Sequence, residues 1–253
     1  MLQYFKTAFK TFVVLVCLLP AVLQCRAQQA AWEDTIVLKE DIKKNWKQFI
    51  VPGTLITVGA AGAATNWGID KTVKNMRNNC YPAFNSKLDD YLQFAPLPAV
   101  FMLDALGLPA ANNWQQQCWL LFKAELMMVL LVDPVKRITG RQRPNGASNR
   151  SFPSGHTAQA FLAAHFFHKE FGKNYPWLSA GMYAVATTTG ALRVLKNRHW
   201  LSDVMAGAGI GILCTELSYL TQRKNKKRDI AGMPLIFPAY QQGGFSCVAL
   251  FKL

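Results

Sequence analysis

The chain has 253 residues, of which 51% are hydrophobic and 17% are charged, and its mean hydropathy is +0.09. The length suits one domain with a sizeable core, and the mean hydropathy is low for a chain that lies wholly in lipid. The formal net charge of +14 suits an anionic partner, and because no nucleic-acid-reading motif is present, we expect a phosphorylated substrate or an anionic lipid and no nucleic acid.

The chain opens with a predicted signal peptide, residues 1–27. A basic start, an apolar run over residues 12–23 and small residues at Cys25 and Ala27 are typical of an exported protein, and we expect cleavage after Ala27. An uncleaved membrane anchor is the alternative, although the apolar run is short for a membrane span.

The next segments predict an all-α protein. Residues 28–49 mix apolar and charged residues and predict an amphipathic helix that lies on a membrane surface. Residues 50–222 form the predicted core, a bundle of about six helices. Its apolar segments span residues 50–67, 92–108, 119–132, 157–171, 177–192 and 203–220. The polar stretch over residues 70–90 is interpreted as a link between helices.

The composition changes after the last apolar segment. Residues 223–253 begin with a basic run, Arg223–Arg228. Apolar residues then flank Gln241-Gln242-Gly243-Gly244, a pattern that predicts a short C-terminal β-hairpin.

Four cysteines would remain after cleavage of the signal peptide. Cys80, Cys118, Cys214 and Cys247 show no metal-ligand spacing, so we expect no metal site. Disulfide pairing stays open for an exported chain. Cys214 lies in an apolar helix and is interpreted as a buried thiol.

Three short motifs carry the predicted chemistry. The first, Lys136 to Pro144, is rich in cations, and its planar Arg143 guanidinium suits phosphate oxygens. The second, Pro153-Ser154-Gly155-His156, begins an apolar helix. Ser154 can cap that helix, Gly155 allows a ligand close to the backbone, and the exposed N–H groups attract an anion.

The third motif runs from Arg193 through His199 to Asp203. His199 and Asp203 are four residues apart, a spacing that on a helix places both on one face within hydrogen-bond reach. Asp203 would then fix the tautomer of His199 and stabilise its positive form. A helix-capping aspartate near a buried histidine is the plain structural alternative for this pair.

Taken together, the three spacings resemble the signature of the type 2 phosphatidic acid phosphatase (PAP2) superfamily. Lys136 stands six residues before Arg143-Pro144, Pro153 to His156 follows, and Arg193, His199 and Asp203 complete the order. The family includes lipid phosphatases, bacterial non-specific acid phosphatases and vanadium haloperoxidases. Leu192 stands where the family usually has serine, which removes one phosphate hydrogen bond.

The resemblance implies a role for each motif residue. His199 attacks phosphorus and forms a phosphohistidine, Asp203 orients His199, and His156 protonates the departing oxygen and then activates water. The remaining residues hold the phosphate and stabilise the transition state: Lys136, Arg143, Ser154, Gly155 and Arg193. No metal or other cofactor is implied, and no obligate protein partner is evident.

The predicted activity is that of a phosphatase acting on a phosphorylated lipid of the bacterial envelope. Lipid A, undecaprenyl diphosphate and phosphatidylglycerol phosphate are all candidates, because the motif residues contact only the phosphoryl group. The predicted location is the inner membrane with a periplasm-facing site, or the periplasm in association with the membrane. A periplasmic acid phosphatase on soluble esters, a haloperoxidase and an anion-binding helical transporter are the alternatives, and the number of spans stays open.

Overall fold

The computed structural model describes residues 46–65, 68–222, 235–241 and 244–250, the last two ranges by their backbone only. The chain divides into two units, residues 1–221 and 222–253. The predicted signal peptide and most of the predicted amphipathic helix lie outside the described residues.

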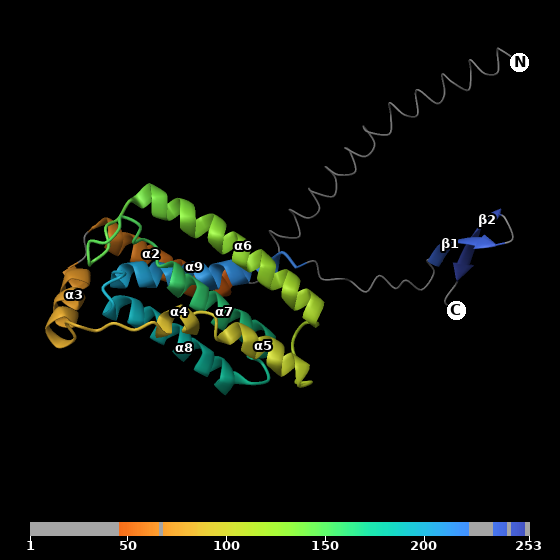
Figure 1. Cartoon of the computed structure of the whole chain (residues 1–253), viewed down its shortest axis with the longest axis horizontal. Helices are drawn as coiled ribbons and strands as arrows, with labels where there is room; N and C mark the ends of the chain where they lie inside the picture. The colour runs from red at the N-terminus through yellow and green to blue at the C-terminus, as the bar shows by residue number, and fades with distance from the viewer. Residues whose placement is uncertain (1–45, 66–67, 223–234, 242–243, 251–253) are drawn as a thin grey trace, which may run out of the picture. The chain divides into compact units, whose positions relative to one another are not determined.

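The described part of the first unit is entirely helical, which confirms the predicted all-α class. Its elements in chain order are the 3₁₀ helix η1 (Trp46–Phe49) and the α-helices α2 (Ile50–Ala64), α3 (Gly68–Cys80), α4 (Leu88–Leu92), α5 (Pro96–Ala105), α6 (Trp114–Thr139), α7 (Gly155–Phe171), α8 (Pro176–Leu195) and α9 (Leu201–Leu220). Figure 1 shows α6, α7, α8 and α9 running along the bundle.

Two segments differ from the prediction. The polar stretch over residues 70–90 is not a simple link, because most of it forms the amphipathic helix α3 and the short α4. The third apolar segment is only the middle of α6. A capping box at Asn113 starts this helix earlier, and Gly140, with φ of 53°, ends it after Lys136. Lys136 therefore lies in the last turn of α6.

Helix α9 is the centre of the bundle and packs against α2, α6 and α7. Its glycines permit this close packing. A Cβ atom at Gly211 would lie 2.2 Å from the Ala158 carbonyl oxygen of α7, and one at Gly207 would lie 2.5 Å from the Ser154 carbonyl oxygen. Gly59 of α2 approaches the α9 backbone in the same way. Gly207 thus lets the start of α7, with its motif, sit directly on α9.

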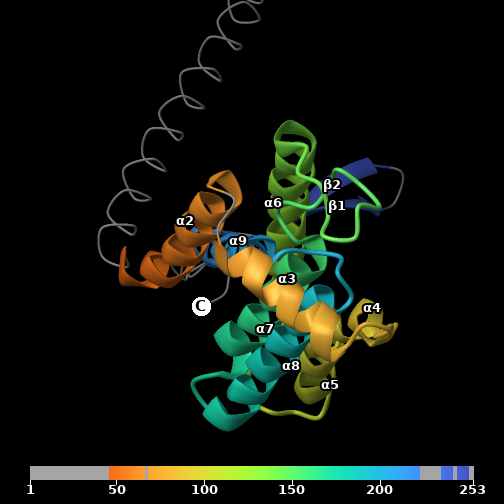
Figure 2. The ribbon, with the colours of Figure 1, turned by 90° about the vertical axis from the view of Figure 1, so that its left-hand side faces the viewer.

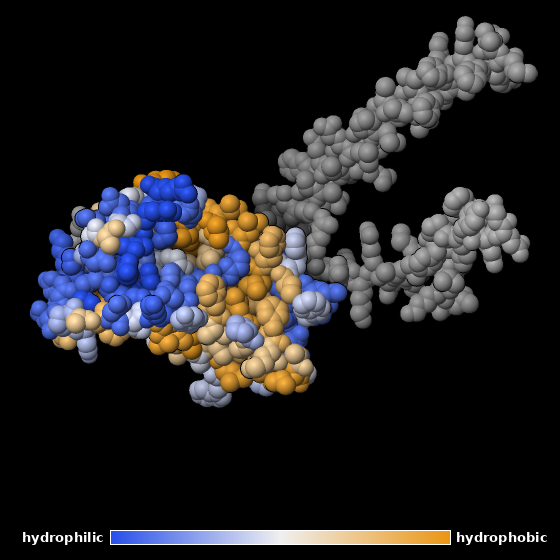
Figure 3. Space-filling model, in the orientation of Figure 1, coloured by the Kyte–Doolittle hydropathy of each residue, from blue (hydrophilic) through white to orange (hydrophobic). Residues whose placement is uncertain are grey.

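Helix α3 lies across one end of the bundle (Figures 1 and 2). Asp70 in its first turn is buried and accepts hydrogen bonds from the backbone N–H and the hydroxyl of Ser202 at the start of α9, at 3.0 and 2.5 Å. This end is hydrophilic on its surface, whereas hydrophobic surface covers the opposite half of the view in Figure 3. Trp119, Phe122 and Leu130 of α6 are among the exposed apolar side chains.

One described helix, α9, is long and apolar enough to cross a membrane, and 72% of its apolar window is buried inside the unit. The segments Trp46–Ala64 and Gly68–Cys80 meet the criterion only when they are counted together, across a bend of 82°. The buried core helix of a soluble protein can be equally long and apolar.

In the second unit, β1 (Leu235–Gln241) pairs antiparallel with β2 (Gly244–Leu250), with Leu235 opposite Leu250.

Cys80, Cys118 and Cys214 are free thiols, and Cys214 is fully buried as predicted. The side chain of Cys247 lies outside the described part.

Candidate active site

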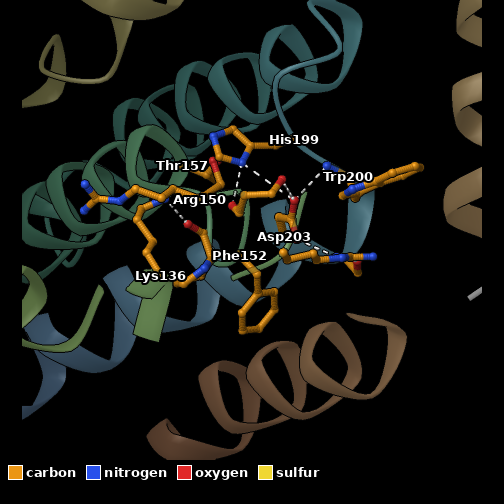
Figure 4. Close-up of polar contacts among 12 residues, drawn as sticks. Lys136, Arg150, Phe152, Thr157, His199, Trp200 and Asp203 are labelled. Carbon is orange, nitrogen blue, oxygen red and sulfur yellow. Dashed lines mark hydrogen bonds and ion pairs between the residues drawn. The ribbon is translucent and has the colours of Figure 1, made fainter. Parts of the chain in front are cut away.

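The three motifs meet at the loop that leads into α7. The Lys136 ammonium donates a hydrogen bond to the Pro153 carbonyl at 2.5 Å. The Ser154 backbone N–H donates to the Asp203 carbonyl at 3.0 Å. These contacts join the end of α6, the start of α7 and the start of α9, which brings together segments that are far apart in sequence (Figure 4).

His199 is held in a single orientation beside this loop. Its ring is only 2% exposed, and its Nδ1 lies 2.8 Å from the Ser151 carbonyl oxygen. A carbonyl can only accept, so the proton resides on Nδ1 and Nε2 keeps its lone pair. Burial lowers the pKa of His199 to about 4, so the ring is neutral near pH 7. A neutral imidazole with a free Nε2 is a competent nucleophile.

Asp203 does not hydrogen-bond to His199 in this structure. The nearest atoms, Asp203 Oδ2 and His199 Nδ1, are 3.7 Å apart, beyond hydrogen-bond distance. The helical-face argument for the pair is wrong, because His199 precedes α9, which begins at Leu201. Asp203 Oδ2 instead accepts from the Ser151 hydroxyl at 2.5 Å and from the Trp200 backbone N–H at 2.9 Å.

Ser151 therefore bridges the pair and was missed by sequence reasoning. Its carbonyl accepts from His199 and its hydroxyl donates to Asp203. The residue stands outside the motif at Pro153, and a backbone carbonyl leaves no signal in side-chain type, so no pattern pointed to it.

Arg193 is almost fully buried, and only part of its guanidinium is satisfied. Nη1 donates to Asp89 Oδ2 at 2.6 Å, and Lys196 Nζ lies 2.7 Å from the other oxygen of the same carboxylate. The Nε–H of Arg193 is buried and has no hydrogen-bond partner. Asp89, which sequence reasoning did not single out, thus fixes one edge of the guanidinium and leaves the Nε donor free for an incoming acceptor.

Arg143 presents a second buried donor of the same kind. Its Nε is also without a partner, and with Gln117 Oε1 and Arg193 Nε it makes up the set of buried unpaired side-chain atoms in the described residues. Native proteins leave very few buried donors unpaired, and each one calls for an explanation. The mutual repulsion of Arg143 and Arg193 contributes to a lowered Arg143 pKa, after the larger effect of burial. Two such donors on neighbouring cations mark a site for an anion.

Ser154 and Gly155 occupy the predicted helix start but differ in detail from the prediction. Ser154 is the residue before α7, yet its hydroxyl pairs with the Thr157 hydroxyl at 2.9 Å and does not cap a backbone N–H. A Cβ at Gly155 would lie 3.7 Å from Lys136 Cε, an ordinary contact. The protein's own packing therefore does not demand glycine there.

His156 lies in the first turn of α7 and contacts an aspartate from α4. Its Nε2 is 2.9 Å from Asp90 Oδ1, and Arg193 Nη1 is 3.9 Å from the same oxygen. Asp90 thus links the predicted general acid to a predicted phosphate-binding arginine. Burial and the nearby Arg193 lower the pKa of His156, whereas Asp90 opposes this shift.

The Asp90→Asn variant should move the alkaline limb of the rate profile to lower pH. A general acid must carry its proton, and the carboxylate stabilises that protonated form. Its removal lowers the His156 pKa further, so activity is lost at a lower pH than in the wild type. The pH dependence of kcat for both proteins measures this, and an unmoved or raised alkaline limb would exclude the Asp90–His156 coupling.

One group of side chains has the geometry of a metal site. The ligand atoms of Asp89, Asp90 and His156 lie within 4.8 Å of one another. Both oxygens of Asp89, however, already accept from the cations Arg193 and Lys196. These three side chains therefore fit a metal cation poorly. We infer instead that the two aspartates hold Arg193 and His156 in position.

The chain is similar in sequence to known proteins. Residues 117–227 match the family model of the PAP2 superfamily. A lipid A 1-phosphatase from Porphyromonas gingivalis is 37% identical over 163 residues, which cover 63% of this chain and 36% of that protein. A lipid A 1-phosphatase from Rhizobium etli is 33% identical over 108 residues, which cover 36% of this chain and 44% of that protein. The matched stretches thus span less than half the length of these relatives.

A solved structure shares the fold. It is the first transmembrane PAP2 type phosphatidylglycerolphosphate phosphatase from Bacillus subtilis, with a TM-score of 0.53 and 21% identity over 70% of this chain and 98% of the other. The stretch that matches the family model, residues 117–227, includes all three motifs, from Lys136 to Asp203. Residues 117–227 of this chain are therefore similar in sequence to the PAP2 superfamily, and the fold agrees with that of a PAP2 type phosphatase.

Proposed function

We propose that this chain is a phosphatase that removes a phosphoryl group from a phosphorylated envelope lipid through a phosphohistidine at His199. The observation that carries the proposal is the pair of buried, unpartnered Nε donors of Arg143 and Arg193. They belong to the motifs that meet beside the buried, neutral His199. Fixed donors around a nucleophile are what phosphoryl transfer requires, because its catalysis depends on position and charge stabilisation.

In the first step, His199 Nε2 attacks phosphorus and the bond to the lipid oxygen breaks. His156 supplies the proton that the departing oxygen needs. The bound phosphoryl oxygens accept hydrogen bonds from Arg143 and Arg193, and Lys136 adds positive charge. The His199 ring becomes positive in this step, and the Ser151 carbonyl and the nearby Asp203 carboxylate stabilise that charge.

In the second step, water attacks the phosphohistidine. His156, now neutral, takes a proton from that water, which regenerates the acid for the next cycle. The bond between phosphorus and Nε2 breaks, and inorganic phosphate leaves. His199 returns to the neutral form that burial favours.

For the substrate we propose a phosphorylated lipid, with lipid A 1-phosphate as the first candidate. The support is that two relatives above 30% identity are named lipid A 1-phosphatases. The exposed apolar side chains of α6 suit contact with lipid, and we propose an envelope membrane location with the site facing away from the cytoplasm. We also propose that residues 1–27 are a signal peptide and that residues 28–49 form an amphipathic helix. The C-terminal hairpin is proposed to be a stable part of the fold.

A panel of substrates tests the proposal. Detergent-solubilised full chain is incubated with lipid A, undecaprenyl diphosphate, phosphatidylglycerol phosphate and a soluble phosphate ester, and phosphate release is measured. We expect release from at least one lipid, with lipid A preferred over the soluble ester. Release from the soluble ester alone would favour a non-specific acid phosphatase, and no release from any ester would overturn the proposal.

Chelation of metal ions should leave the activity unchanged. The proposed mechanism needs no metal ion, since the cations Lys136, Arg143 and Arg193 provide the charge that a metal provides in other phosphatases. Phosphate release is measured before and after incubation with EDTA, and again after Mg²⁺ is added to the EDTA-treated protein. A loss of activity that a divalent cation restores would contradict the metal-independent mechanism.

A further inference from the structure

A buried ion-pair network beside the site centres on Arg141, a residue to which the roles above assign nothing. Arg141 follows Gly140 at the end of α6, and its side chain is 14% exposed. Nη1 donates to Asp203 Oδ1 at 2.5 Å and to the Ser202 hydroxyl at 2.7 Å. Nη2 donates to Asp70 Oδ2 at 2.9 Å. One planar guanidinium therefore joins two carboxylates from α3 and α9.

Both carboxylates need a cation, because both are buried. Asp203 is 0% exposed and Asp70 is 3% exposed. A buried carboxylate without a paired cation is strongly disfavoured. Among the described residues, Arg141 is the one Lys or Arg side chain within ion-pair distance of either carboxylate. Arg141 therefore stabilises the negative charge of both carboxylates through direct ion pairs.

The contacts also fix the rotation of the Asp203 carboxylate. Arg141 holds Oδ1, and this leaves Oδ2 turned toward His199 at 3.7 Å. The face of the Trp200 ring, 5.4 Å from the guanidinium carbon, adds a cation–π contact that holds Arg141 in place. The guanidinium of Arg141 is thus occupied by protein partners, whereas Arg143 and Arg193 each keep a buried Nε donor without a hydrogen-bond partner.

We propose that Arg141 is a positioning residue for the phosphatase reaction, holding the Asp203 carboxylate toward His199 while the His199 ring gains positive charge. The inference rests on the proposed function. Because the guanidinium of Arg141 donates to Asp203, Ser202 and Asp70, it acts on the chemical step through Asp203 and does not bind the phosphate. Its loss should therefore lower kcat and leave KM nearly unchanged.

The experiment compares Arg141→Gln with a matched control, Arg77→Gln. Arg77 of α3 also ties this helix to the bundle, through an Nε donor 2.6 Å from the Leu195 carbonyl, but it contacts no reacting group. We expect kcat of Arg141→Gln to fall about 10- to 100-fold with KM within about threefold of the wild type. Arg77→Gln should keep kcat within about threefold, even if its melting temperature falls equally.

The conservative variant Arg141→Lys gives a second readout. A lysine ammonium is a point charge that can neutralise Asp203 but cannot span both carboxylates, so kcat should recover in part. Equal losses of kcat in the Arg141→Gln and Arg77→Gln variants would show that Arg141 serves only the fold. Full activity of Arg141→Gln, or a loss confined to KM, would overturn the positioning role.

The proposed function and this inference fail separately. If the wild type releases no phosphate from any ester, the phosphatase proposal is wrong. If the wild type is active and His199→Gln is inactive while Arg141→Gln matches the wild type, the phosphatase proposal stands and the role of Arg141 is wrong.

Discussion

Replacing His199 with glutamine should reduce phosphate release by about ten-thousandfold or more. The variant removes the nucleophilic Nε2, and no other described side chain offers an imidazole held by the Ser151 carbonyl. Substrate binding should be largely retained, since the phosphate is held by Lys136, Arg143 and Arg193 in this account. Phosphate release under single-turnover conditions, with lipid binding measured in parallel, gives both quantities.

The matched control for this variant is His168→Gln. His168 lies on α7, and its Nδ1 is 2.8 Å from the Ser179 hydroxyl, so its hydrogen bond stays within α7 and α8. This contact involves no predicted site residue, so the His168→Gln variant should keep near-wild-type activity. A His199→Gln protein that folds and still turns over at the wild-type rate would exclude His199 as the nucleophile.

Replacing Arg193 with glutamine should affect both activity and stability. It removes a donor to the transition state, which is expected to lower kcat about 100- to 1,000-fold. It also deprives the fully buried Asp89 of one of its two cations, and removal of a partner from a buried pair costs about 3 kcal/mol of unfolding free energy. Kinetic assays and denaturant unfolding in detergent measure the two effects.

The double variant Arg193→Gln/Asp89→Asn separates these effects. Neutralising Asp89 removes the uncompensated buried charge, so part of the lost stability should return. Activity should stay low, because the donor to the phosphate is still missing. Recovery of activity together with stability would show that Arg193 acts only through the fold.

The motif positions were predictable because the chemistry of phosphate binding restricts residue type and spacing. Lys136, His156 and His199 come from separate segments, and the order of the three motifs was enough to expect them at one site. The structure brings these segments to the loop that contains Ser151 and Pro153, through contacts of Lys136 and His199. The helical class followed from the apolar segments, which α7, α8 and α9 extend by only a few residues.

The contacts of each motif residue were less predictable. The spacing of His199 and Asp203 suggested a shared helix, but the helix begins between them, and the Ser151 carbonyl binds Nδ1 instead. Asp89 and Asp90 lie in a polar stretch that was interpreted as a link. Their role depends on how α4 packs against α7 and α8, which no local pattern encodes.

Trapping the phosphorylated enzyme tests the central claim most directly. Protein and lipid substrate are mixed, quenched rapidly under alkaline conditions that preserve phosphohistidine, and digested for mass spectrometry. The His156→Gln variant is measured in parallel with a phosphate ester whose leaving group needs no proton, because loss of the base should then slow hydrolysis and let the intermediate accumulate. The account predicts one phosphoryl group on the peptide that contains His199, and none in the His199→Gln protein. A phosphoryl group on another residue, or turnover with no phosphorylated protein at any time point, would contradict it.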